Sequence, residues 1–84
     1  MVVYVIHEEN HGILGVAATR EAAIQWLIRS EWMRGSNEIW IPEIKDTKFI
    51  GELYPDWEKW LMKEATPDDF ENMGFWIIEE NLIE

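Results

Sequence analysis

The chain has 84 residues, a net charge of −10 and no cysteine. This length is typical of one domain, close to the size at which a single hydrophobic core is just sufficient, so we expect one domain over residues 1–84. With 48% hydrophobic and 29% charged residues the chain has the composition of a folded protein and not of a disordered one. The lack of cysteine excludes disulfides, thiol nucleophiles and cysteine-ligated metals, and it favours a reducing cytoplasm. The apolar segment 1–6 is too short to cross a membrane and lacks the basic residues of a signal peptide, so we expect neither.

The acidic residues are unevenly distributed. Residues 52–84 hold ten of the seventeen acids and only two lysines, a net charge of −8, whereas residues 1–51 have seven acids and five basic residues, a net charge of −2. Such a charge disfavours direct binding to nucleic acid or to an anionic membrane, because contacts to phosphate supply much of that affinity. It favours instead a protein partner with a basic surface.

The first third of the chain predicts a β-hairpin followed by a helix. Apolar, β-branched runs at 2–6 and 13–17 flank a segment of turn composition that ends in Gly12. Thr19 is then placed as a helix N-cap, and Arg34 followed by Gly35 has the pattern of a helix C-terminus. We therefore expect a helix over 20–34.

This predicted helix has two apolar strips. The main strip contains Ala23, Ile24, Leu27 and Ile28 at core spacing. Trp26 lies roughly 100° away from its centre, on a second strip with Ala22 and Met33. Because one sheet cannot cover both strips, either another segment of the chain or a partner is expected to cover Trp26.

The rest of the chain predicts a looser hairpin, two helices and a last strand. Short apolar runs at 39–41 and 49–50 favour the hairpin, with Pro42 limiting it to an edge position. Pro55 has the position of a first helical residue for a helix ending near Ala65. Thr66 and the proline after it predict a helix of one or two turns that Gly74 ends. A strand over 75–84 follows, its first half buried and its second half exposed. The expected class is α+β: a small antiparallel sheet, made of the N-terminal hairpin and the C-terminal strand, packed against the central helix, with a second, shorter helix.

Segments at both ends of the chain resemble small uncharacterised accessory proteins of phages and prophages of Gram-positive bacteria. The resemblance rests on Tyr4-Val5-Ile6, His11-Gly12-Ile13-Leu14-Gly15-Val16, Ala23-Ile24-Gln25-Trp26-Leu27-Ile28 and Gly74-Phe75-Trp76-Ile77-Ile78-Glu79-Glu80, and residues 36–53 take no part in it. It implies an accessory role in the cytoplasm of a host cell, in which the protein binds and blocks a host protein. It supplies no active-site residues.

Catalytic and cofactor signatures are missing from the sequence. The glycines do not fit a phosphate-binding loop. His7 and His11 flank a predicted turn beside two glutamates, where solvation is a more common outcome than metal binding. Adjacent carboxylates such as Glu79 and Glu80 point to opposite faces of a strand, which disfavours joint acid–base work. We expect no enzyme activity, no cofactor and no metal.

Two functional hypotheses remain open. The first is a small acidic phage-type inhibitor that occupies the basic DNA- or RNA-binding surface of a host defence protein, with Glu80 and Glu84 spaced about 13–14 Å apart along the last strand, on the scale of nucleic-acid phosphates. The second is a self-associating or scaffold module that uses the Trp26 strip, in which the acids serve only solubility. Trp57, Trp60 and Trp76 are expected in the core, and Asp56, Asp68 and Asp69 lie at helix starts, where acids are favourable. The candidate partner-binding residues are Glu58, Glu64, Asp69, Glu71, Glu79, Glu80, Glu84, Trp26 and Trp32.

Overall fold

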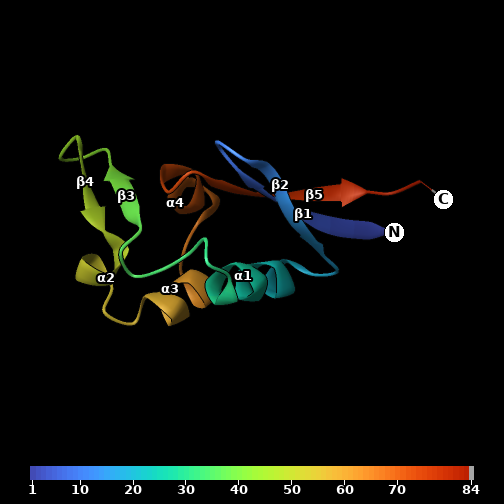
Figure 1. The fold of residues 1–84 in the computed structure, drawn as a ribbon, viewed down its shortest axis with the longest axis horizontal. Coiled ribbons are helices and arrows are strands. Elements are labelled where there is room, and N and C mark those ends of the chain that lie inside the picture. Colours follow the sequence, from blue (N-terminus) through green and yellow to red (C-terminus); the bar gives the residue numbers. More distant parts are fainter. Residues whose placement is uncertain (84) are drawn as a thin grey trace.

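A three-stranded antiparallel sheet and a separate two-stranded hairpin lie toward opposite ends of the molecule (Figure 1). The structure is a computed structural model and describes residues 1–83. The elements in chain order are β1 (Val2–Glu8), β2 (Gly12–Ala17), α1 (Arg20–Arg29), β3 (Glu38–Ile41), β4 (Asp46–Phe49), α2 (Ile50–Leu53), α3 (Trp57–Lys63), α4 (Pro67–Asn72) and β5 (Phe75–Asn81). The predicted α+β class is confirmed. In the described part of the chain, no helix is long and apolar enough to cross a membrane.

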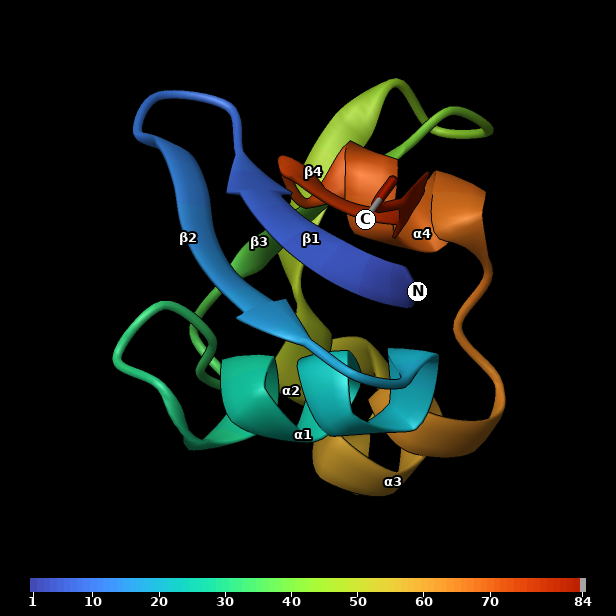
Figure 2. The same cartoon turned by 90° about the vertical axis from the view of Figure 1, so that its right-hand side faces the viewer.

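β1 is the central strand of the three-stranded sheet, between β2 and β5. The predicted N-terminal hairpin is confirmed, with Gly12 in the left-handed region at φ 74°. The register with β2 shifts between Ile6 and His7, so that Leu14 is an extra residue on β2. α1 covers one face of this sheet, and Figure 2 shows the helix beneath the strands.

α1 ends at Arg29, so the prediction that it extends to residue 34 was wrong. Ser30 has an extended backbone, and its Oγ donates to the Leu27 carbonyl (2.5 Å) and accepts from the Trp32 amide (3.1 Å). The following loop is held by Asn37, whose side chain bonds the Trp32 carbonyl and the Arg34 amide. A serine side chain and an asparagine side chain therefore replace the backbone bonds of the expected last turn.

The same change corrects two residue assignments. Met33 lies outside the helix and is only 1% exposed, so it is part of the core and not of a strip with Trp26. Gly35 is not among the residues with positive φ and does not cap a helix.

The middle of the chain forms the expected second hairpin, with shifted bounds. β3 pairs antiparallel with β4 from Glu38↔Phe49 to Ile41↔Asp46, and Lys45 lies at φ 53° in the turn. Ile50, expected in a strand, is fully buried as the first residue of α2.

The C-terminal third follows the predicted order with shorter elements. α3 begins at Trp57 and not at Pro55. The cap at Thr66 is confirmed as a capping box, and Gly74 follows α4 at φ 88°, as expected of the residue that ends a helix. β5 ends at Asn81, where its pairing with β1 stops, so the strand predicted to reach Glu84 is too long. Glu84 itself lies outside the described residues.

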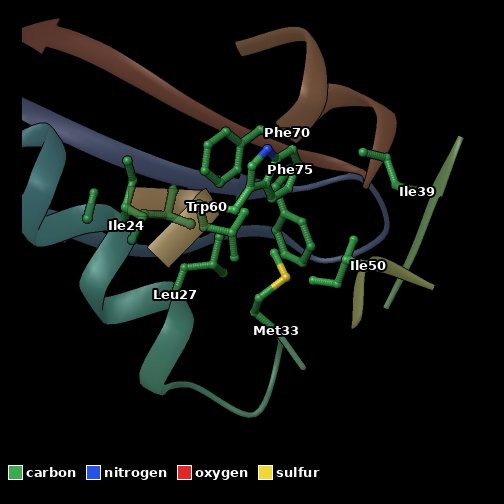
Figure 3. Packing of buried hydrophobic residues seen from close by; sticks show 11 residues of the cluster. Ile24, Leu27, Met33, Ile39, Ile50, Trp60, Phe70 and Phe75 are labelled. Atoms are coloured by element: carbon green, nitrogen blue, oxygen red, sulfur yellow. The ribbon is translucent and has the colours of Figure 1, made fainter. Parts of the chain in front are cut away.

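The three-stranded sheet, the second hairpin and all four helices contribute residues to the hydrophobic core (Figure 3). Its buried members are Ile6, Ala23, Ile24, Leu27, Met33, Ile39, Ile50, Trp60, Leu61, Phe70 and Phe75. Trp60 is buried and Trp57 packs against the cluster, as expected. Trp76 is not in the core: it pairs with His7 on the other face of the sheet and is partly exposed, while its neighbour Phe75 is 3% exposed.

Candidate functional site

An open cleft of about 560 Å³ lies between the β3 segment and α4, near the end of the molecule that holds the second hairpin. Its size is in the range of pockets that accept side chains or small ligands. The lining residues are Ile39, Trp40, Ile41, Pro42, Glu43, Leu53, Tyr54, Asp68, Asp69, Glu71 and Asn72. The cleft thus combines an apolar and aromatic wall from β3 and α2 with a wall of acids from α4.

Aromatic side chains make up much of the apolar wall. Trp40 is 43% exposed on β3, while the neighbouring Ile39 points into the core at 4%. Tyr54 stacks on Trp60, with ring centroids 3.8 Å apart and planes 9° from parallel. An exposed tryptophan and a tyrosine fixed on a buried ring are surfaces on which a cationic or planar side chain packs well.

Four carboxylates line the cleft, and its lining contains no lysine or arginine. Burial raises the pKa of the Tyr54 hydroxyl above its ordinary value of 10.0, and the charges of Asp69, Glu64 and Glu43 raise it further. The acids therefore lie near enough to Tyr54 to set a negative potential at the cleft. A cation bound there would make that potential less negative.

Asp69 has a structural role as well. Its Oδ2 accepts from the Thr66 amide (2.8 Å) and from the Thr66 hydroxyl (3.0 Å), which completes the capping box of α4. These bonds fix the carboxylate at the cleft wall without cancelling its charge.

In residues 1–83, most of the acids have no basic side chain paired with them. Among residues 1–83, no lysine or arginine forms an ion pair with a carboxylate, and the pairing present is that of His11 Nδ1 with Glu8 Oε2 at 2.6 Å. That contact, with the Asn10 amide as a second donor, lowers the pKa of Glu8. Because the other carboxylates of residues 1–83 have no basic side chain paired with them, their charge is available to a binding partner.

The histidine-flanked turn does not form a metal cluster. His11 contacts Glu8 and packs edge-on against Trp32, with ring centroids 4.7 Å apart, whereas His7 pairs with Trp76 within the sheet. In the part of the chain that the structure describes, no three or more histidine and acidic side chains are grouped to hold a metal ion.

The structure distributes the candidate acids over three places. Asp69 and Glu71 lie in the cleft. Glu58 is on α3 and Glu64 directly follows it, and each lines a hollow that Lys59 and Lys63 also line.

The candidate acids Glu79 and Glu80 are on β5. Glu79 accepts a hydrogen bond from the Tyr4 hydroxyl at 3.0 Å, and Glu80 is on the opposite face of the strand. The terminal end of β5 lies away from the second hairpin (Figure 1). Cleft and strand therefore do not present one continuous array, and Glu84 is outside the described residues.

The candidate tryptophans are each covered in part by the chain itself. Trp26 is 39% exposed and its indole lies over Gly15, where an added Cβ would be 3.4 Å from the ring. Trp32 is 36% exposed and contacts His11. The segment that was expected to cover Trp26 is therefore β2 of the same chain.

Sequence reasoning missed part of the cleft. Trp40, Glu43 and Tyr54 are not among the predicted partner-binding residues, and Asp68 is predicted only as a helix-start residue. The signal available was the run from Trp40 to Glu43, in which an aromatic, a proline and an acid follow one another.

Comparison of the chain with protein-family models, with curated proteins and with solved structures found no match. The resemblance to phage accessory proteins therefore stays a prediction.

Proposed function

We propose that this protein is a small, acidic, non-catalytic binding module that recognises a basic segment of another protein through the cleft between β3 and α4. The single observation that carries this proposal is the combination, in one open cleft, of four carboxylates, exposed aromatic surface and no basic residue. Lysine and arginine side chains combine an apolar stem with a cationic head, and they fit a site with both kinds of wall.

The class of partner follows from the charge distribution. Acids without internal ion pairs in residues 1–83 produce a long-range field that accelerates encounter with a basic surface. Surfaces with clustered lysine and arginine are typical of proteins that bind DNA or RNA. We therefore propose that the module inhibits a nucleic-acid-acting protein, such as a host defence enzyme in the setting of a phage accessory protein, by covering its basic surface.

The test compares two variants with the same net charge. The cleft variant carries Glu43→Gln, Asp68→Asn and Glu71→Gln, and it leaves Asp69 in place because that residue caps α4. The control variant carries Glu21→Gln, Glu31→Gln and Glu52→Gln, three exposed acids outside the cleft. Each set of changes removes three negative charges, so both variants have three fewer than the wild type, whose net charge is −10.

Wild-type protein immobilised on a resin is expected to capture basic proteins from host lysate at low salt and to release them at high salt. The cleft variant should bind a captured, purified partner at least about tenfold more weakly, a loss of about 1.4 kcal/mol, and the control variant should bind nearly as the wild type does. Equal weakening by both variants would show that only the total charge matters. Double-stranded DNA or RNA should compete with the module for the partner; a partner that holds both together would contradict the inhibitory mechanism.

The alternative, a scaffold built on the Trp26 and Trp32 strip, has less support. Met33 is in the core, and each tryptophan already contacts its own chain.

A further inference from the structure

Within residues 1–83, the three-stranded sheet has an apolar face on which Ile13, Val16 and Ile78 are exposed. We call it the outer face: the side of the three-stranded sheet turned away from α1. Alternate residues of a strand share a face, and the register assigns the members. They are Val3, Val5 and His7 of β1, Ile13 and Val16 of β2, and Trp76, Ile78 and Glu80 of β5.

Burial within the outer face differs from that of an ordinary solvated sheet. Val5 is only 8% exposed although it is not part of the hydrophobic core cluster, whereas Ile13, Val16 and Ile78 around it are 64%, 60% and 40% exposed. The solvated face of an antiparallel sheet normally carries polar side chains. Here Glu80 is the one carboxylate among the eight members, in a chain with seventeen acids. Contiguous apolar surface of this kind marks an interaction site.

We propose that the outer face is a self-association surface on which a second copy of this chain packs face to face around a two-fold axis. The charge pattern favours a second copy as the occupant. Two copies with a net charge of −10 each repel one another, and the outer face, with a single acid, is a surface on which that repulsion is small. A strongly basic partner would find almost no complementary charge there.

The arrangement of rows is self-complementary. Val16, Val5 and Ile78 are aligned across the three strands and form an aliphatic central row. A two-fold axis along this row places each of these residues opposite its own copy.

The flanking rows then face one another. Glu80 of one copy would face the row of the other copy that contains His7 and Trp76, which are hydrogen-bond donors to a carboxylate. Glu80 of each copy thereby has hydrogen-bond donors in the other copy, and the two-fold symmetry repeats this pairing once on each side of the axis.

The size of the face sets the expected affinity. Three strands about 4.8 Å apart, with side chains, give a surface on the order of 500 Å² per copy, at the low end for specific interfaces. We expect a reversible dimer with a Kd in the range of about 10–100 µM.

Salt separates this association from binding of a basic partner. Salt screens the repulsion between like-charged copies and so strengthens the dimer, whereas it weakens binding to a basic surface. The outer face does not include any residue of the cleft, so failure of one proposal leaves the other standing.

Sedimentation equilibrium from about 10 µM to about 1 mM, at low and high salt, tests for the dimer. The wild type should dimerise, and more strongly in high salt. The double variant Val16→Thr with Ile78→Thr keeps β-branched residues and net charge, and it should raise Kd at least about tenfold. The control Ile44→Thr removes an apolar residue that is 53% exposed in the β3–β4 turn, and it should leave Kd unchanged. A wild type that stays monomeric throughout overturns the proposal.

A cross-linking experiment tests the geometry directly. Because the chain has no cysteine, Ile78→Cys supplies one thiol at a partly exposed site, and a short bismaleimide should join two copies through it. Ile44→Cys should not form the linked dimer. Equal yields from both variants, or none from Ile78→Cys at concentrations where the wild type dimerises, would show that the copies meet elsewhere.

Discussion

Tyr54 and Trp60 stack face to face, with ring centroids 3.8 Å apart and an interplanar angle of 9°. The two rings come from different elements: Tyr54 ends α2, where its amide donates to the Ile50 carbonyl at 2.8 Å, and Trp60 is buried in α3. The stack therefore joins a wall of the candidate cleft to the hydrophobic core. Tyr54 contributes to the free energy of unfolding through the packing of its ring and through the titration of its hydroxyl. Substitutions that remove the ring or only the hydroxyl separate these two contributions.

Replacing Tyr54 by leucine removes the aromatic stack while keeping an apolar side chain. Aromatic pairs contribute about 0.5–1.5 kcal/mol beyond the area they bury, so Tyr54→Leu should lower the free energy of unfolding by about 1–2 kcal/mol. Tyr54→Phe keeps the ring and is the matched control, with a change below about 0.5 kcal/mol. Urea unfolding followed by far-ultraviolet circular dichroism measures both; an equal loss from both variants would assign the effect to the hydroxyl.

Tyr54 also predicts a loss of stability at alkaline pH. Burial, and then the charges of Asp69, Glu64 and Glu43, raise the pKa of the folded protein's Tyr54 above 10.0. The neutral tyrosine is therefore favoured by folding. Its contribution is fully present below the unfolded-state pKa near 10 and is lost as pH rises through the higher folded-state pKa.

Urea unfolding from about pH 8 upward should accordingly show a steeper alkaline decline in the wild type than in Tyr54→Phe. Tyr4 is a second source, because its hydrogen bond to Glu79 raises the pKa of its hydroxyl as well. Tyr4→Phe should remove a separate part of the decline. An alkaline decline that is the same in all three proteins would contradict the assignment.

Local signals predicted the parts of this fold that short-range chemistry determines. Gly12 in the hairpin turn, the Thr66 cap and Gly74 after α4 each satisfy a backbone requirement that a few neighbouring residues specify. The continuous apolar, β-branched run at 2–6 likewise predicted β1.

Contacts between residues far apart in the chain determine the parts of the fold that local sequence patterns did not predict. The helical sequence pattern of α1 continues to residue 34, but the Ser30 and Asn37 side chains donate to the carbonyls of Leu27 and Trp32. The helix ends early as a result, and Met33 is buried in the core. Trp76 looked like a core residue because both faces of its strand begin apolar, and only the register with β1 assigns Phe75 to the core. Trp40 and Glu71 line the same cleft although they are about thirty residues apart in the chain, and no local pattern encodes that arrangement.

Thr66 should contribute measurably to stability through its cap. Its Oγ accepts from the Asp69 amide, and Asp69 in turn accepts from the Thr66 amide and hydroxyl. Thr66→Ala should lower the free energy of unfolding by about 1 kcal/mol, the usual cost of losing a cap, and Thr66→Ser should retain most of it. If Thr66→Ala also weakens partner binding while Thr66→Ser does not, the position of Asp69 in the cleft depends on the cap.

The loop after α1 crosses α2 at two glycines, and this crossing leaves no room for a side chain. The Gly51 amide donates to the Gly35 carbonyl at 2.9 Å, and a Cβ added to Gly51 would lie 2.9 Å from the same oxygen. Backbone atoms cannot rotate away as a flexible side chain can, so Gly51→Ala must separate the two segments. Ile50, whose amide bonds the Asn37 carbonyl at 2.9 Å, would then lose its position in the core.

We expect Gly51→Ala to lower the free energy of unfolding by about 2–3 kcal/mol, the range for overpacking combined with a lost buried contact. Ser36→Ala, an exposed change beside the same crossing, should shift it by less than about 0.5 kcal/mol. Thermal unfolding of the two variants gives the comparison. Alanine has a higher helix propensity than glycine, so if the crossing were loose, Gly51→Ala in α2 would stabilise the protein. The sign of the change alone therefore decides whether the loop is packed against α2.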